Sequence, residues 1–317
     1  MSVIVFVENS DSGLKGVSAE AIIYARKLSE EVNVLAVGTK WSEDTLKGMG
    51  KFGAKKVWWA NDPIFDHADS LSIAGALKDL IDKSQADIIV VAHTSLGASV
   101  AAMVSVKIQG SLATSVTGLP DTTNGFVVER SIFTGKAFEK VTLLKGKKIL
   151  AIKKNAVSMI DYEGVAAVEV YQYSASSPES GVKVTGEEKM EGDILLSDAE
   201  IVVSAGRGLK GPENWGMVEE LAKTLKAATA CSKPVSDMEW RPHHEHVGQT
   251  GIKVAPQLYI AIGISGAIQH LAGVNSSKCI VVINKDPEAP FFKEADYGIV
   301  GDAFEVVPKL NEALKKL

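Results

Sequence analysis

The stretch LYIAIGISGAIQH, residues 258–270, combines features that together predict its local fold. Leu258–Ile262 is a short run of aliphatic and aromatic residues, which is typical of a buried strand. Small residues follow at Gly263–Gly266, and the residues after them read as a helix. Strands that pass through glycine-rich turns directly into helices are the units of parallel α/β sheets. The stretch therefore predicts an α/β fold with backbone N–H groups exposed where a helix starts.

A second glycine-rich turn occurs earlier, at Gly206–Gly211, and has the spacing G-x-G-x-x-G. It follows a predicted strand at 200–204 and precedes a predicted helix at 212–227, the context in which such glycines let backbone approach a phosphate. A dinucleotide site also needs an acidic residue about 20 positions later to bind the ribose. Ser232 and Lys233 follow the next strand instead, which argues against an ordinary NAD site. The residues alone indicate a phosphate-bearing cofactor, with a plain strand-to-helix turn as the alternative.

A third candidate motif is VGQTG at 247–251, preceded by RPHHEH at 241–246. The amide and hydroxyl groups of the first stretch suit hydrogen bonding to the edge of a ring. The histidines of the second admit a metal site, with Cys231 as a ligand from elsewhere in the chain. Consecutive loop residues point in different directions, however, so we expect a polar surface loop and no metal ligand. The sequence also lacks the motifs of common hydrolases and metalloenzymes.

Two α/β domains are predicted from the order of the apolar runs. The first domain reads as a Rossmann-like parallel sheet with strands at 3–7, 32–37, 57–60 and 87–92. Between residues 113 and 173 several β-rich runs (FVVERSIF, AFEKVTLL, ILAIK, AAVEVYQY) predict antiparallel hairpins added to that sheet.

The segment from 174 to 198 is polar and has no sustained period, which indicates a domain boundary. After it the α/β pattern resumes, with further strands near 228–231, 258–262, 279–283 and 297–300 and a closing amphipathic helix at 304–317. We expect an N-terminal domain at 1–190, a linker at 191–197 and a C-terminal domain at 198–317.

Composition excludes several classes of protein. The 317 residues include 34 Lys and Arg against 39 Asp and Glu, a net charge of −5, and no basic cluster predicts nucleic-acid binding. Two cysteines are too few for a disulfide scaffold, which indicates a reducing compartment. The longest apolar stretch has about 11 residues, where a membrane span needs about 20. We therefore expect a cytoplasmic protein with no membrane insertion.

From Val203 onward the chain resembles the alpha subunit of electron transfer flavoprotein. The motifs occur in the order and approximate spacing of that family, and the stretch from Leu258 to Asn284 is nearly its signature. They are SAGRGLKGPEN at 204–214, VGQTG at 247–251, LYIAIGISGAIQHLAG at 258–273, VVINKDPEAPFF at 281–292 and ADYGIVGD at 295–302. The N-terminal half resembles the family more loosely, through its α/β pattern and length.

The resemblance implies a fold, a cofactor and partners. It implies a doubly wound, flavodoxin-like C-terminal domain that binds FAD, and an N-terminal domain that packs against a beta subunit in a heterodimer. The beta subunit commonly carries AMP or, in electron-bifurcating members, a second FAD. The complex takes electrons from acyl-CoA dehydrogenases and related flavoenzymes of fatty acid β-oxidation. It passes them to a quinone oxidoreductase, and it is an electron carrier with no substrate turnover of its own.

The resemblance also implies FAD contacts at specific residues. They are Arg207, Ser232, Lys233, Val247, Gly248, Gln249, Thr250, Ser265, Gly266, Ala267, Ile268, Gln269, His270, Asn284 and Asp302. Thr250 corresponds to a threonine near the flavin N5, His270 to an imidazole near O2, and Asn284 and Asp302 to contacts at the adenosine end. Lys233 replaces the arginine that is usual in the family, which keeps the charge but loses the planar guanidinium.

Three other functions remain open on the sequence. An electron-bifurcating subunit would share all of these motifs, because much of that distinction lies in the partner subunit. An NAD(P)-dependent oxidoreductase would use the turn at 206–211, although the ribose-binding acid is missing. An adenine-nucleotide sensor would use residues 1–190, where no phosphate-binding loop is visible.

Overall fold

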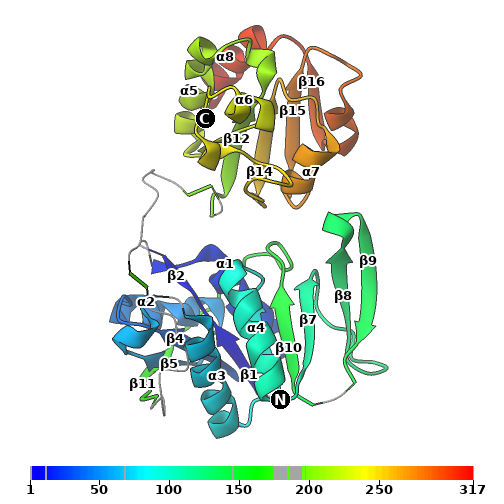
Figure 1. The fold of residues 1–317 in the computed structure, drawn as a ribbon. Coiled ribbons are helices and arrows are strands. Elements are labelled where there is room, and N and C mark those ends of the chain that lie inside the picture. Colours follow the sequence, from blue (N-terminus) through cyan, green and yellow to red (C-terminus); the bar gives the residue numbers. More distant parts are fainter. Residues whose placement is uncertain are drawn as a thin grey trace. The chain divides into compact units, whose positions relative to one another are not determined.

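The computed structural model describes residues 2–10, 13–67, 69–144, 146–173, 184–185, 195–196 and 198–316, which form two α/β units (Figure 1). The N-terminal unit comprises residues 1–187 and the C-terminal unit residues 188–317. Most of the expected linker, residues 191–194 and 197, lies outside the described residues. Each unit is described below by itself.

A nine-stranded sheet forms the centre of the N-terminal unit, in the order β11-β5-β4-β1-β6-β10-β7-β8-β9. Its order reverses between β1 and β6, as in Rossmann-like folds. The strands are β1 (Val3–Phe6), β4 (Val32–Val37), β5 (Lys56–Ala60), β6 (Ile88–Ala92), β7 (Ser111–Val116), β8 (Val127–Ile132), β9 (Ala137–Thr142), β10 (Lys148–Ile152) and β11 (Ala167–Val170). A separate two-stranded ladder joins β2 (Asn9–Ser10) and β3 (Gly13–Leu14).

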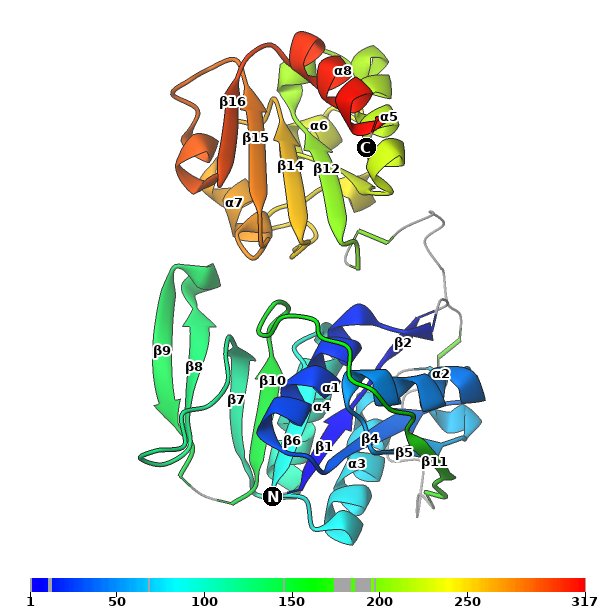
Figure 2. The ribbon, with the colours of Figure 1, turned by 180° about the vertical axis from the view of Figure 1, so that it is seen from behind.

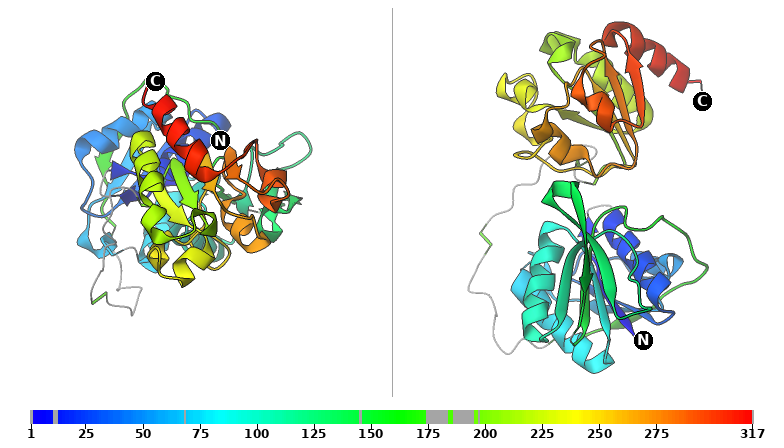
Figure 3. Two further views of the ribbon diagram at one scale, coloured as in Figure 1. Left: turned by 90° about the horizontal axis from the view of Figure 1, so that it is seen from above. Right: turned by 90° about the vertical axis from the view of Figure 1, so that its right-hand side faces the viewer.

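Helices cover both faces of this sheet. Residues of α1 (Gly16–Leu28) and α2 (Glu43–Gly48) pack with one set of strand side chains. Residues of α3 (Ser70–Ser84) and α4 (Ser95–Lys107) pack with the alternate set. The two layers appear on opposite sides of the sheet in Figure 2 and in the right-hand view of Figure 3. Short 3₁₀ turns lie at Met49–Phe52, Pro63–Phe65 and Phe133–Gly135.

The antiparallel hairpins expected between 113 and 173 are confirmed only in part. β8 and β9 form an antiparallel hairpin, and β7 meets β8 antiparallel. The run ILAIK is wrong as a hairpin strand, because β10 lies parallel between β6 and β7. The run AAVEVYQY is also wrong, because β11 pairs parallel with β5 at the far edge of the sheet. Both strands find partners distant in sequence, which local patterns cannot indicate.

The C-terminal unit has five parallel strands in the order β13-β12-β14-β15-β16. The strands are β12 (Ile201–Ala205), β13 (Ala228–Cys231), β14 (Leu258–Ile262), β15 (Ile280–Asn284) and β16 (Tyr297–Val300). In chain order within the unit this is 2-1-3-4-5, the flavodoxin-like arrangement of a doubly wound sheet. The fold class expected for both domains is therefore confirmed.

Helices on both faces bury the C-terminal sheet. α5 (Gly216–Leu225), α6 (Lys233–Asp237) and α8 (Ala303–Leu314) pack on one face. α7 (Ile268–Val274) and the segment around Phe291 pack on the other. Four further 3₁₀ turns lie at Arg207–Leu209, Pro212–Asn214, His243–Glu245 and Pro290–Glu294. In the described parts of both units, no helix combines the length and apolar character needed to cross a membrane.

Candidate functional site

The candidate site lies at the carboxyl edge of the C-terminal sheet. All five strands are parallel, so their carboxyl ends share one edge, and the strand order reverses between β12 and β14. Ligands of doubly wound sheets bind at such a reversal. The turns that follow these two strands touch, since the Gly206 N–H donates to Ile262 O (2.9 Å) and the Gly208 N–H to Gly263 O (3.1 Å). The two glycine-rich turns predicted from the sequence therefore form one structure.

The glycines at this junction are needed for the packing of one turn against the other. A Cβ atom added to Gly206 would lie 2.4 Å from Gly263 O, and one added to Gly208 would lie 2.6 Å from Gly263 Cα. Gly263 itself has φ +59°, a conformation that L residues adopt at a cost. The G-x-G-x-x-G spacing thus has a packing role that the sequence did not indicate.

Backbone N–H groups are available in the second turn. Within the described part of the chain, the N–H groups of Ser265, Gly266 and Ala267 donate to no protein acceptor. Ala267 is the N-cap of α7 and supplies no side-chain cap. Adjacent N–H groups at a helix start attract an anion, and a diphosphate is one ligand that would satisfy them. Ile268 and Gln269, the first two residues of α7, have exposed side chains beside this turn.

The loop at 247–251 rests against α7. The Gln249 N–H donates to Gln269 O at 2.7 Å, and a Cβ atom added to Gly273 would lie 2.5 Å from the Gly248 N. Val247 is fully buried, whereas the Gln249 and Thr250 side chains are exposed. The structure therefore places the predicted contacts at 247–250 next to those at 265–269.

The end of β13 adjoins the same region. The Ser232 N–H donates to Ala205 O (3.1 Å), and the Val247 N–H donates to the carbonyl of Cys231 (3.0 Å). Cys231 is a free, fully buried thiol, and burial raises its pKa to about 12, with Glu245 adding to the effect. Ser232 is buried at the start of α6, and Lys233 follows it as an exposed cation. Arg207, directly after β12, is the other exposed cation predicted here.

Asn284 and Asp302 already have structural partners. Asn284 donates its side-chain N–H to Ile264 O (3.0 Å) and accepts the N–H of Asp286 (3.1 Å), so it braces the turn after β14. Asp302 is the N-cap of α8 and accepts the Phe304 N–H at 3.0 Å. Both residues lie at the carboxyl edge of the sheet. Their contact with the adenosine end of a cofactor stays a prediction.

His270 is buried rather than displayed on the surface. Its side chain is 7 % exposed, and its Nε2 lies 2.9 Å from the hydroxyl oxygen of Tyr259, which is fully buried on β14. The His270 Nδ1 is also buried and has no hydrogen-bond partner of good geometry among the described residues. Burial, helped by His246, lowers the pKa of His270 to about 4, while the Val247 carbonyl acts in the opposite direction. The imidazole is therefore neutral near pH 7.

The run RPHHEH is a polar surface segment only in part, because residues 242–244 are exposed whereas the two residues after them are buried. Glu245 and His246 are 7 % and 2 % exposed. Arg241 donates two hydrogen bonds to the Glu245 carboxylate, at 2.8 and 2.5 Å, and one to Glu219 on α5 at 2.7 Å. This Arg241 network, formed with Glu245 and Glu219, explains the burial, because a paired and hydrogen-bonded charge tolerates loss of water. Across the described residues no group of three or more His, Cys, Asp or Glu side chains is arranged to hold a metal ion.

Sequence reasoning missed two residues of this region, His246 and Tyr259. His246 directly precedes the loop at 247–251, and its Nδ1 is buried without a partner among the described residues. Burial and the charges of His243 and Lys233 lower its pKa. Tyr259 carries the only hydroxyl in the run LYIAI. A buried phenol needs a partner, so that hydroxyl was the available signal.

The corresponding reversal in the N-terminal unit, between β1 and β6, is filled by protein. The Glu8 carboxylate accepts a hydrogen bond from Thr94 and pairs with Lys15 at 3.1 Å, while the Glu8 N–H donates to the Ser18 hydroxyl (2.8 Å). A hollow of about 40 Å³ lies nearby and is lined in part by Thr94. Its volume is about that of one water molecule. This arrangement argues against the adenine-nucleotide sensor.

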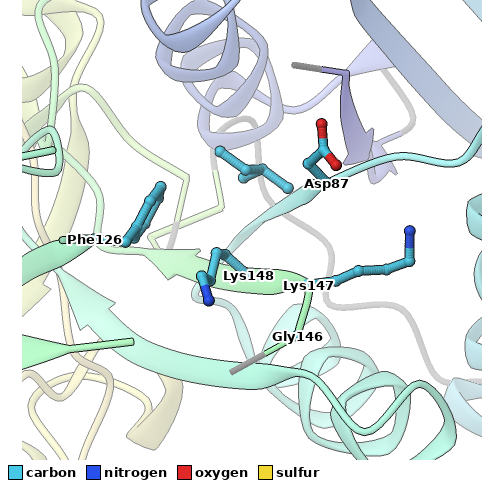
Figure 4. A pocket seen from close by; sticks show the side chains of 6 residues that line it. Asp87, Phe126, Gly146, Lys147 and Lys148 are labelled. Atoms are coloured by element: carbon cyan, nitrogen blue, oxygen red, sulfur yellow. The ribbon is translucent and has the colours of Figure 1, made fainter. Parts of the chain in front are cut away.

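A larger hollow of about 450 Å³ lies at the opposite, amino-terminal ends of β6 and β10 (Figure 4). Lys147 and Lys148 line it, but their side chains point in different directions (Figure 4). Lys147 donates to Ala86 O at 2.5 Å. The two cations therefore do not converge on one anion in this hollow.

Comparisons with known proteins give matches in both units of the chain. The family model described as the electron transfer flavoprotein FAD-binding domain matches residues 195–275, and that described as the electron transfer flavoprotein domain matches residues 3–178. The electron transfer flavoprotein subunit alpha of Bacillus subtilis is 36% identical over 318 residues, covering 99% of this chain and 98% of that protein. The subunit of the same name from Mycobacterium tuberculosis is 37% identical, with 99% and 98% covered. That of Pseudomonas aeruginosa is 34% identical, with 99% and 100% covered.

The residues at the carboxyl edge fit FAD, the cofactor of this domain. The unused N–H groups at 265–267 suit its diphosphate, and the exposed cations Arg207 and Lys233 suit its negative charge. The exposed amide and hydroxyl of Gln249 and Thr250 suit the polar edge of its ring. Together with the matches over nearly the whole chain, this shows that the protein belongs to the family of electron transfer flavoprotein alpha subunits.

Proposed function

We propose that this chain is the FAD-carrying subunit of a heterodimeric electron carrier that serves acyl-CoA dehydrogenases and related flavoenzymes. It passes their electrons to a quinone oxidoreductase. The observation that carries the proposal is the meeting of two glycine-rich turns and the loop at 247–251 at the strand-order reversal of an FAD-binding domain. Both cysteines are free, which supports a reducing compartment such as the cytoplasm.

FAD, when bound, supplies the redox chemistry, while the protein supplies binding and electrostatics. In this proposal the N–H groups at 265–267 hold the diphosphate, and Gln249 and Thr250 hydrogen-bond the ring edge. Lys233 supplies positive charge, because the neutral His270 cannot. A nearby cation favours negative charge that develops on its ligand. The arrangement thus sets the midpoint potential of bound FAD.

The N-terminal unit is proposed as the docking platform for the beta subunit. Support comes from the β8–β9 hairpin, where Phe133 and Phe138 are 75% and 62% exposed. Exposed aromatic side chains are enriched in protein interfaces. Replacing Phe138 by Glu is expected to weaken the heterodimer at least tenfold, whereas Val106→Glu on α4, at a comparably exposed apolar residue, leaves it intact. Equal effects of the two changes in titration of the purified subunits would contradict the placement.

The function is tested on the chain purified together with its beta subunit. A visible flavin spectrum with one FAD per heterodimer, reduced by dithionite in two resolved one-electron steps, is the expected result. Addition of an acyl-CoA dehydrogenase with its substrate bleaches the flavin, and a quinone oxidoreductase restores its colour. A second flavin per heterodimer and bleaching by NADH would indicate electron bifurcation instead. A colourless complex that takes up no added FAD would overturn the proposal.

A further inference from the structure

The loop at 247–251 packs directly on the imidazole ring of His246, the residue that precedes it. The His246 side chain is 2 % exposed. A Cβ atom added to Gly251 would lie 2.8 Å from His246 Nδ1, and one added to Gly248 would lie 3.3 Å from Nε2. Two glycines of the loop therefore lie against the two ring nitrogens, and their lack of a side chain lets the backbone close over the ring.

Backbone hydrogen bonds hold the loop in this closed position. The Ile252 N–H donates to His246 O at 2.8 Å, and the Gly248 N–H donates to Ile252 O at 3.2 Å, so the two ends of the loop are joined. The Gln249 N–H donates to Gln269 O on α7 at 2.7 Å. The loop is thus anchored at its base and on α7, with the His246 ring packed under it.

The space under the loop suits a neutral imidazole and not a charged one. His246 Nδ1 is buried and has no hydrogen-bond partner among the described residues. A neutral imidazole can leave one nitrogen without a proton, whereas a protonated imidazole has an N–H at both nitrogens. Protonation with the loop closed would therefore bury a charge and leave the Nδ1–H without an acceptor. Opening the loop would let water solvate both N–H groups.

The groups around the ring also disfavour a proton on it. The titratable groups are Lys233 and Asp237 on α6, His243 on the same segment, His270 on α7, and Cys231, which forms an isolated bridge with His246. The His243 ring centroid lies 5.6 Å from that of His246. Burial lowers the pKa of His246, His243 and Lys233 lower it further, and only Asp237 acts in the opposite direction. The enclosed ring is therefore neutral at pH 7.

We propose that His246 is a positioning residue that holds the loop at 247–251 closed, and that a proton on its ring opens the loop and speeds the release of FAD in mild acid. The inference rests on the proposed FAD site, in which this loop holds the ring edge of the flavin. His246 acts through the loop and not by contact with the cofactor, because Gly248 and Gly251 cover its ring.

The size of the effect follows from proton linkage. A histidine released from the closed loop titrates near pH 6.5, whereas the enclosed ring takes up a proton only at lower pH. The population of the open loop should therefore rise severalfold between pH 7.5 and 5.5, and by at most about tenfold.

The variants that test this are His246→Gln and a matched control, His244→Gln. Glutamine has a flat amide of similar reach, which can occupy the space under the loop but takes up no proton in this pH range. His244 belongs to the same segment, but its side chain is exposed. Each variant is studied as the complex with the beta subunit at pH 7.5 and 5.5.

The first measurement is hydrogen exchange by mass spectrometry on peptides that span residues 246–252, expressed as protection relative to the intrinsic rate at each pH. In the parent and in His244→Gln, protection should fall severalfold from pH 7.5 to 5.5, while peptides of β14 keep theirs. In His246→Gln the loop should be equally protected at both pH values. An equal fall in His246→Gln, or no fall in the parent, would overturn the proposal. This measurement decides the inference even if the complex binds no FAD, in which case only the proposed function fails.

The second measurement is the rate at which FAD leaves the complex, followed by the fluorescence of the released flavin. In the parent this rate should rise between pH 7.5 and 5.5 by a factor similar to the loss of protection, because the loop must open before the flavin leaves. In His246→Gln the rate should be the same at both pH values. Equal acceleration in the two proteins would contradict the role of His246.

Two further variants test the proposal if His246→Gln does not fold, because the residues they change are exposed. Lys233→Ala removes a charge that opposes a proton under the closed loop, so the acid loss of protection should become smaller. Asp237→Asn removes a charge that favours this proton, so the loss should become larger. Both are measured at low ionic strength, where exposed charges are least screened. Changes in the same direction in both variants, or no change in either, would overturn the proposal.

Discussion

Gly208 and Gly263 belong to two different turns, yet their backbones are so close that a Cβ atom on Gly263 would lie 2.8 Å from Gly208 Cα. Gly208→Ala is therefore expected to separate the turns and destabilise the C-terminal unit by about 1–3 kcal/mol, with FAD affinity falling at least tenfold. The control is Gly216→Ala, because a Cβ atom there meets nothing within 4 Å and α5 gains a better helix former. Denaturant unfolding and FAD titration compare the two. Equal stability of both variants would show that the two turns can move apart without loss of stability.

Lys233 is the exposed cation beside the loop at 247–251, and its charge lowers the pKa of His246. Lys233→Ala is expected to lower the midpoint potential of bound FAD and to raise the pKa of His246, while Lys233→Arg preserves both. Redox titration and histidine NMR follow the two effects separately. If neither substitution moves the potential, Lys233 does not act on the flavin.

The folded protein should lose stability in mild acid because of His270. The ring has a pKa of about 4 when folded and about 6.5 when unfolded, so the unfolded chain binds the extra proton between these values. The neutral, buried His270 therefore contributes fully to the free energy of unfolding above pH 6.5. This contribution decreases as the pH falls and is about 2 kcal/mol smaller at pH 5. His270→Asn should remove this part of the slope in unfolding measurements between pH 7 and 5. An unchanged slope would assign the acid sensitivity to other groups.

The Arg241 network should stabilise the segment that precedes the loop at 247–251. Arg241→Ala leaves the Glu245 carboxylate buried without its partner and is expected to cost about 3 kcal/mol in the free energy of unfolding. Arg241→Lys keeps the charge but cannot form both hydrogen bonds, so an intermediate loss is expected. Lys315→Ala breaks a 2.6 Å pair with Glu220 in which both side chains are more than half exposed, and should cost less than about 1 kcal/mol. Similar losses in all three variants would contradict this account.

Much of the fold could be predicted from short apolar runs. The bounds of β13, β14 and β16 agree with those read from the sequence, because each run is bounded by small or polar residues. The directions of β10 and β11 could not be predicted, because these strands pair with strands that are distant in the sequence, as Lys148 with Ile88 and Ala167 with Lys56. The helix α4 was not predicted either, since its run SLGASVAAMVSVK is apolar on most sides and shows no helical period.

The motifs of the site could be predicted from the sequence, but the contacts between them could not. The turns at 206–211 and 263–266 are recognisable by their glycines, yet nothing local indicates that these glycines face one another. The burial of Glu245 is compensated by its pairing with Arg241, and the run of polar residues at 241–246 does not indicate which of its side chains pair. Tertiary structure alone supplies that information.

Cys231 has a consequence for the durability of a redox protein. Its backbone carbonyl accepts the N–H of Val247, so the residue adjoins the loop proposed to hold a flavin, while its thiol is fully buried. With a pKa of about 12, only about one thiol in 100,000 is ionised at pH 7, and the thiolate is the reactive form. Burial therefore insulates this sulfur from oxidation and disulfide exchange, and electrons can pass through the domain without being diverted to its own cysteine.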